Sequence, residues 1–240
     1  MSRRAQIEGA VDALYDAFAG YPLRDWTDPC PHCHTADDER VLRRAPLREL
    51  TADDLPRYTM DAMTVWGDVG DFKHFLPRIM EIAVGEGFGW PDVEIVYGRI
   101  AYGFWTSWPA AEQTAIRRLV MAHWHAVLAA DVDLFECDTV LTCIMLIEDD
   151  LTPYLRYWEQ SDDPVPLLNL AEYAAQVGRI RAGERQWNAY LDGSKGPAQV
   201  LAWLGSDDLT ERLTARRGTP PVRSALEQVL RAIHSADRRR

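Results

Sequence analysis

No stretch of this sequence has the roughly 18–20 consecutive apolar residues that a membrane crossing requires. Near the amino terminus, the apolar residues are interrupted by Glu8, Asp12 and Asp16, so we expect no secretory signal. We therefore expect a cytoplasmic protein, whose cysteines stay reduced. The four cysteines of the 240-residue chain are then not expected to form a disulfide framework.

Positive charge is scarce as well. The chain carries 26 lysines and arginines against 37 aspartates and glutamates, for a formal net charge of -11. Such an acidic surface repels phosphate backbones and anionic lipids, so we expect neither nucleic acid nor a membrane as a partner. It favours a basic protein partner instead. The only lysines are Lys73 and Lys195, and this preference for arginine is typical of a high-GC bacterial genome.

The sequence also lacks the common catalytic motifs. It contains no H-E-x-x-H, no His-Asp dipeptide, no P-loop and no Gly-x-Ser-x-Gly. Gly85, Gly87 and Gly89 follow no predicted strand and do not have nucleotide-binding spacing, so we expect no bound nucleotide. The motif search therefore identifies no catalytic residue.

Apolar residues recur at helical spacing along almost the whole chain. Ile7, Val11, Leu14 and Phe18, for example, share one face of a helix. No sustained alternation bounded by hairpin turns is present. The pattern predicts an all-α fold, either an irregular multi-helix bundle or a short α-solenoid-like stack of about ten helices. We expect a single domain over 1–240, with a soft boundary near 161–166.

Capping residues, prolines and glycines set the expected ends of the helices. Thr51 is a predicted N-cap of a helix that ends near Trp66, and Pro77 is expected to kink or break the next helix. The other ranges expected to be helical are 3–19, 36–44, 92–104, 109–130, 134–148, 152–159, 164–181, 184–191, 195–204, 207–216 and 221–236.

A cysteine-rich loop follows the first predicted helix. Cys30 and Cys33 have the C-x-x-C spacing with which two thiolates share one tetrahedral zinc ion. The other ligands would be histidines, either His34 or His32 in the loop or His74 further along the chain. We therefore expect Cys30, Cys33, His34 and His74 as metal ligands and Zn²⁺ as the cofactor.

Three alternatives to zinc apply to this loop. A loop without metal is one, because Cys137 and Cys143 lie six residues apart on a predicted helix and do not provide a second C-x-x-C. A redox pair is another, although no predicted strand precedes the loop. The third is C-x-x-C-H haem attachment, which needs export, so no haem is expected.

Two phrases extend the pattern beyond the cysteine loop. Residues 46–51 read PLRELT and residues 67–79 read GDVGDFKHFLPRI. In this order they resemble a group of uncharacterised bacterial proteins that share a cysteine-rich loop followed by PLRELT and GDVxDFKHFLPRI-like segments. The resemblance is strong over residues 20–85 and loose elsewhere. It implies no known activity, but it makes the polar segment around His74 a candidate site.

Two functions fit these observations. The first is a non-enzymatic helical scaffold of the immunity or adaptor type, which binds another protein through exposed aromatic residues such as Trp90, Trp105 and Trp108. The alternative is a metal-dependent hydrolase. In that hypothesis the region of Cys30, Cys33 and His74 holds the ion, and Asp68 or Asp71 acts as general base.

Overall fold

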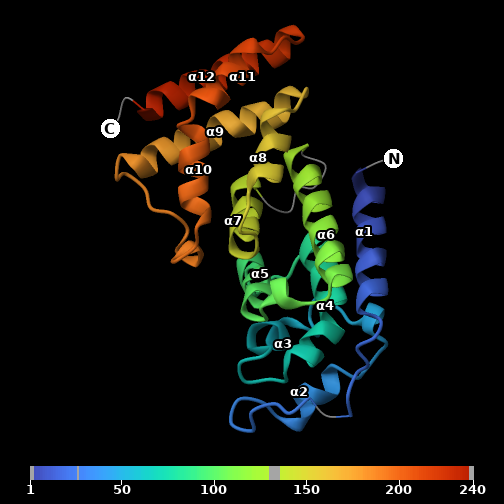
Figure 1. Ribbon diagram of the computed structural model, residues 1–240. Helices are drawn as coiled ribbons and strands as arrows, with labels where there is room; N and C mark the ends of the chain where they lie inside the picture. Colours follow the sequence, from blue (N-terminus) through green and yellow to red (C-terminus); the bar gives the residue numbers. More distant parts are fainter. Residues whose placement is uncertain (1–2, 26, 130–135, 238–240) are drawn as a thin grey trace. The chain divides into compact units, whose positions relative to one another are not determined.

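The computed structural model describes residues 3–25, 27–129 and 136–237 and confirms the all-α fold (Figure 1). The described part is 68% helical, and ten of its twelve α-helices have seven or more residues, while it contains no strand. None of its helices combines the length and the apolar character needed to cross a bilayer. The α-helices are α1 (Arg3–Phe18), α2 (Ala36–Val41), α3 (Pro56–Asp61), α4 (Val69–Val84), α5 (Val93–Tyr102), α6 (Ala110–Leu128), α7 (Cys137–Ile147), α8 (Thr152–Glu159), α9 (Pro164–Arg181), α10 (Gly196–Leu204), α11 (Asp207–Ala215) and α12 (Pro220–Asp237). The 3₁₀ helices are η1 (Leu47–Glu49), η2 (Trp105–Ser107) and η3 (Ala189–Leu191).

The predicted bounds of α8 and α9 are confirmed, but two predicted helices are wrong. The range 51–66 is a turn followed by the short α3, because the Thr51 amide and hydroxyl both donate to the Asp54 carboxylate and close the chain locally. Met63, with φ of 64°, then turns the backbone away from a helix. The range 184–191 contains only η3, because α9 ends at a turn in which Gly183 has φ of 74°.

The chain forms two compact units, Met1–His123 and Trp124–Arg240. Helix α6 belongs to both, since its residues lie on either side of this division. The segment 161–166, which the sequence marks as a soft boundary, lies inside the second unit between α8 and α9.

The core of the first unit is built around α4. Phe72, Phe75, Leu76 and Ile79 are fully buried and have the spacing of one helix face. Helix α1 packs against α4, as Figure 1 shows in blue and blue-green. Helix α4 continues through Pro77 without a break, so of the kink or break expected there, the break is not found.

The second unit is held by packing between α9 and α12, which lie along each other (Figure 1). A buried carboxylate links the remaining helices. Glu159, at the end of α8, accepts hydrogen bonds from the Trp203 indole at 2.8 Å and from Arg212 Nε at 2.8 Å. These donors come from α10 and α11, so one side chain ties three helices together.

Buried His123, which belongs to the first unit, provides a test of the packing in that unit. Burial lowers its pKa to about 4 from 6.5, and its Nδ1 lies 3.5 Å from the Tyr97 hydroxyl. As the pH falls, His123 therefore gains a proton in the unfolded chain before it does so in the folded chain. The contribution of neutral His123 to the free energy of unfolding is complete above about pH 6.5 and is lost as the pH falls toward 4.

We expect the free energy of unfolding to be about 2 kcal/mol lower at pH 5 than at pH 7 because of this group. Urea unfolding across that range checks the prediction. The His123→Gln variant should lose most of the pH slope whatever its absolute stability. An unchanged slope in that variant contradicts the assignment.

Candidate functional site

The cysteine loop is a tight turn attached to the segment that precedes α4. The Cys30 amide donates to the Val65 carbonyl at 2.7 Å, and the amides of Cys33 and His34 both donate to the Cys30 carbonyl at 3.0 Å. These bonds place both thiols on one turn, as the C-x-x-C spacing predicts.

The two thiols are chemically unequal. Hydrogen bonds from the His32 amide, the His32 side chain and Cys33 lower the pKa of the Cys30 thiol. Donation to Cys30 raises the pKa of the Cys33 thiol instead. Because the thiolate is both the nucleophile and the metal ligand, we expect Cys30 to be the more reactive member of the pair.

A buried carboxylate fixes the ends of this loop. Glu39 is 2% exposed and accepts hydrogen bonds from the Thr27 amide and hydroxyl, from the Trp66 indole and from Arg43. Burial alone would raise the pKa of Glu39, but the bonds from Thr27, Arg43 and Trp66 outweigh it and lower the pKa. The segments before and after the cysteines therefore share one charged anchor.

His34, an expected metal ligand, is packed inside this anchored region. Its side chain is 1% exposed, and its ring centroid lies 4.2 Å from that of Trp66. Its Nε2 is 3.2 Å from Asp61 Oδ2. His34 is therefore packed as a core histidine beside a carboxylate.

His74 and the aspartates before it have structural partners. His74 Nδ1 lies 2.8 Å from the Tyr21 carbonyl oxygen. Asp68 is the N-cap of α4, and Asp71 completes its capping box by accepting from the Asp68 amide at 3.0 Å. Arg24 donates to both carboxylates.

The two capping carboxylates differ in basicity. Burial raises the pKa of Asp71, which is 3% exposed. Burial would raise the pKa of Asp68 too, but hydrogen bonds from Arg24 and from the helix amides outweigh it and lower the pKa. Capping and pairing account for both carboxylates without a catalytic role.

The structure brings Cys30 and Cys33 together but assembles no complete metal site from the expected ligands. Over the described ranges of the chain, no group of three or more His, Cys, Asp or Glu residues could hold a metal ion. Two thiols alone do not meet the four ligands of a structural zinc ion. Zinc binding by Cys30, Cys33, His34 and His74 therefore stays a prediction.

Sequence reasoning missed a buried ion pair between Lys73 on α4 and Glu112 on α6. Lys73 is 6% exposed, and its Nζ lies 2.7 Å from Glu112 Oε2 and 3.0 Å from the Tyr21 hydroxyl. The same ammonium group lies 4.8 Å from the Tyr21 ring centroid and 4.5 Å from the Trp108 ring centroid. The one signal in the sequence is the rarity of lysine in an arginine-rich chain.

An exposed aromatic turn follows α5 and was also missed. Tyr102 is 53% exposed and Phe104 is 77% exposed, and Phe104 has the left-handed φ of 53°. Trp105 and Trp108, which were expected at the surface, are buried at 2% and 6%. The expectation fails for these two because they form the core side of the turn. Trp90 is 52% exposed, as expected.

The aromatic turn, residues 102–108, is held rigidly. The Trp108 indole donates to the Gly103 carbonyl at 2.9 Å, and Ser107 Oγ donates to the Phe104 carbonyl at 2.7 Å. The Gln113 amide group donates to the Trp108 carbonyl at 2.7 Å. Phe104 is thus displayed by a fixed backbone rather than by a frayed loop.

Comparisons of the chain with protein-family models, with curated proteins and with solved structures return no match. The chain is an all-α protein of two compact units, with a dithiol turn and an exposed aromatic turn in the first.

The unequal thiols lead to a labelling prediction. With iodoacetamide at neutral pH, we expect Cys30 to be alkylated severalfold faster than Cys33, although Cys33 is the more exposed. Cys137, whose pKa burial raises to about 12, and buried Cys143 should react only after unfolding. Mass spectrometry of timed samples measures the order.

The Cys30→Ser variant is the control for this order. It removes the thiolate that raises the pKa of Cys33, so Cys33 should react faster than in the unmodified chain. Equal rates for Cys30 and Cys33 in the unmodified chain would contradict the assignment.

The buried ion pair leads to a stability prediction. Lys73→Met leaves the Glu112 carboxylate buried without its cation, so we expect a loss of about 3 kcal/mol in the free energy of unfolding. The double variant Lys73→Met/Glu112→Leu removes both charges and should lose less than Lys73→Met alone. Chemical denaturation of the three chains measures this, and a double variant worse than the single one overturns it.

Proposed function

We propose that this protein is a non-enzymatic helical scaffold of the immunity or adaptor type that binds a basic protein partner. The observation that carries the proposal is the aromatic turn. Phe104 is 77% exposed, yet the surrounding backbone is fixed by the Trp108 indole, which donates to the Gly103 carbonyl, and by Gln113, which donates to the Trp108 carbonyl. A pre-ordered aromatic anchor loses little conformational entropy on binding, which is what protein interfaces favour.

The backbone of Phe104 strengthens this argument. A left-handed conformation costs a non-glycine residue roughly 1–2 kcal/mol. Glycine would avoid this cost, and at 77% exposure the phenyl ring offers little burial in return. A residue that is unfavourable for folding and largely exposed is best explained by contact with another molecule.

The charge of the chain supports the type of partner. A net charge of -11 attracts a basic surface over a distance and raises the rate of encounter. Anionic partners would be repelled by the same field. A basic protein with an apolar pocket for Phe104 is therefore the partner that this surface fits.

The zinc and hydrolase hypotheses have less support. A structural zinc ion at Cys30 and Cys33 stays a prediction beside the scaffold function. The metal-dependent hydrolase that uses Cys30, Cys33 and His74 also stays a prediction, and the contacts of His74 with Tyr21 and of Asp68 and Asp71 with α4 do not favour it.

Replacement of Phe104 by glycine separates binding from folding. Phe104→Gly should raise the free energy of unfolding by up to about 1 kcal/mol, because it relieves the left-handed backbone. The same variant should lose at least tenfold in affinity for the partner. Denaturation measures the first effect, and quantitative purification of the tagged chain from its host, with cross-linking, measures the second.

The matched control is Tyr190→Ala, which removes another exposed aromatic residue, 41% exposed, from the second unit. It should leave partner capture unchanged. If no stoichiometric basic partner is recovered with the unmodified chain, or if Phe104→Gly captures it equally well, the proposal is wrong.

A further inference from the structure

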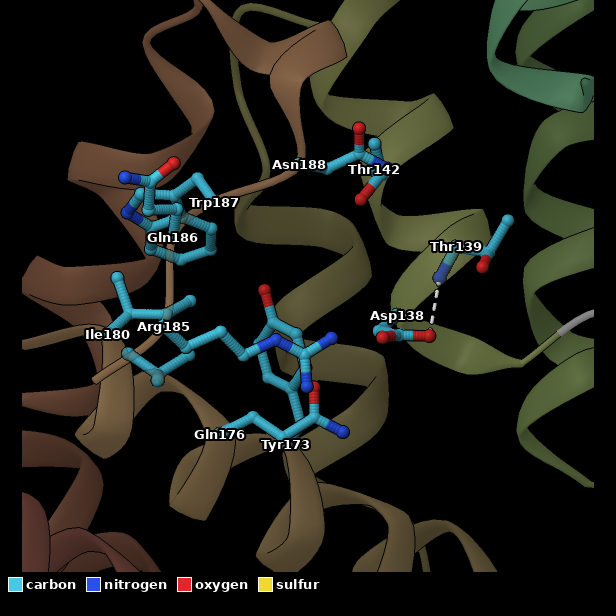
Figure 2. A pocket seen from close by; sticks show the side chains of 11 residues that line it. Asp138, Thr139, Thr142, Tyr173, Gln176, Ile180, Arg185, Gln186, Trp187 and Asn188 are labelled. Carbon is cyan, nitrogen blue, oxygen red and sulfur yellow. Dashed lines mark hydrogen bonds between the residues drawn. The ribbon is translucent and has the colours of Figure 1, made fainter. Parts of the chain in front are cut away.

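A polar pocket lies within the second unit, between α7, α9 and the loop that leads to η3 (Figure 2). Its volume is about 180 Å³, and its lining includes Asp138, Thr142, Tyr173, Gln176 and Arg185. The pocket therefore has room for a small polar ligand.

Tyr173 provides the first polar group that lacks a partner. The residue is 5% exposed, and its ring packs at 5.3 Å from that of Trp158, but its buried hydroxyl has no hydrogen-bond partner in the described structure. A buried hydroxyl left unpaired costs about 1–3 kcal/mol. Figure 2 shows this hydroxyl directed from α9 into the pocket. Burial raises the pKa of Tyr173, so the hydroxyl stays a protonated donor.

Two opposite charges face the same space. Figure 2 shows the Arg185 side chain extending from the loop toward Asp138 at the start of α7. Asp138 Oδ1 accepts from the Thr139 amide at 2.8 Å. Within the described ranges, Arg185 has neither an ion-pair partner nor a hydrogen-bond partner. The pocket thus presents a cation and a hydroxyl donor on one side and a carboxylate on the other.

We propose that this pocket binds a small free α-amino acid. Its carboxylate would accept hydrogen bonds from the Arg185 guanidinium and the Tyr173 hydroxyl, and its ammonium group would donate to the Asp138 carboxylate. The arrangement pairs both charges of a zwitterion and satisfies the buried hydroxyl. A molecule with only one of the two charged groups would leave Arg185 or Asp138 unpaired. This proposal is independent of the partner-binding function, because it concerns another unit and another class of ligand.

Calorimetric titration of the full chain with each of the common amino acids tests the proposal. We expect at least one small amino acid to bind, and we expect its amine and its deaminated acid to bind at least tenfold more weakly. Arg185→Gln and Tyr173→Phe should each weaken binding about tenfold, because each removes a donor to a charged group.

The variants are chosen so that unfolding cannot imitate a loss of binding. Tyr173→Phe keeps the ring and removes only an unpaired hydroxyl, so its thermal midpoint should be unchanged or higher. Arg185 is exposed, and Arg179→Gln on an exposed position of α9 outside the pocket is the matched control, expected to bind normally. The proposal is overturned if no amino acid binds at millimolar concentration, or if Arg185→Gln and Tyr173→Phe bind as well as the unmodified chain.

Discussion

The first unit depends on α4 supplying hydrogen-bond partners to chain segments that have little regular structure of their own. Its polar side chains do not face water in the usual way. His74 contacts the Tyr21 carbonyl, Lys73 pairs with Glu112, and Arg78 donates to the Leu50 carbonyl at 2.6 Å. The contacts of His74 and Arg78 each hold a loop segment, whereas buried Lys73 joins α4 to Glu112 on α6, and an unpaired ammonium group there would be costly. The phrase GDVGDFKHFLPRI therefore describes a structural frame as much as a candidate site.

Sequence reasoning succeeded where one local rule decided the structure. The starts of α8 and α9 agree with prolines at their first turns, and Cys30 and Cys33 lie in the loop that was expected after the first helix. It failed where tertiary contacts compete with local preference. The Thr51–Asp54 turn mimics a helix start, and the exposure of Trp105 and Phe104 depends on which side of a turn faces the core. Periodicity gives no information on that choice, nor on the distance between His74 and the cysteine loop.

The two proposed binding features use opposite chemistry. The aromatic turn of the first unit presents the exposed phenyl ring of Phe104, whereas the pocket of the second unit is polar and lies between α7, α9 and the loop before η3. A partner surface with an apolar pocket suits the former and a small zwitterion the latter. Both contain a residue whose environment is unfavourable for folding alone, Phe104 by its backbone and Tyr173 by its unpaired hydroxyl. Residues whose environment disfavours folding in this way are the first candidates for contact with a ligand.

Helix α6 has a consequence for anyone who wishes to study the halves of this molecule separately. The division between the compact units falls between His123 and Trp124, in the interior of that helix, and both residues are fully buried. A gene divided at this point would produce two fragments that each contain only part of α6, with the backbone hydrogen bonds of the helix interrupted beside two buried side chains. To produce one unit alone, the chain would therefore have to be divided outside α6, so that the whole helix stays with that unit.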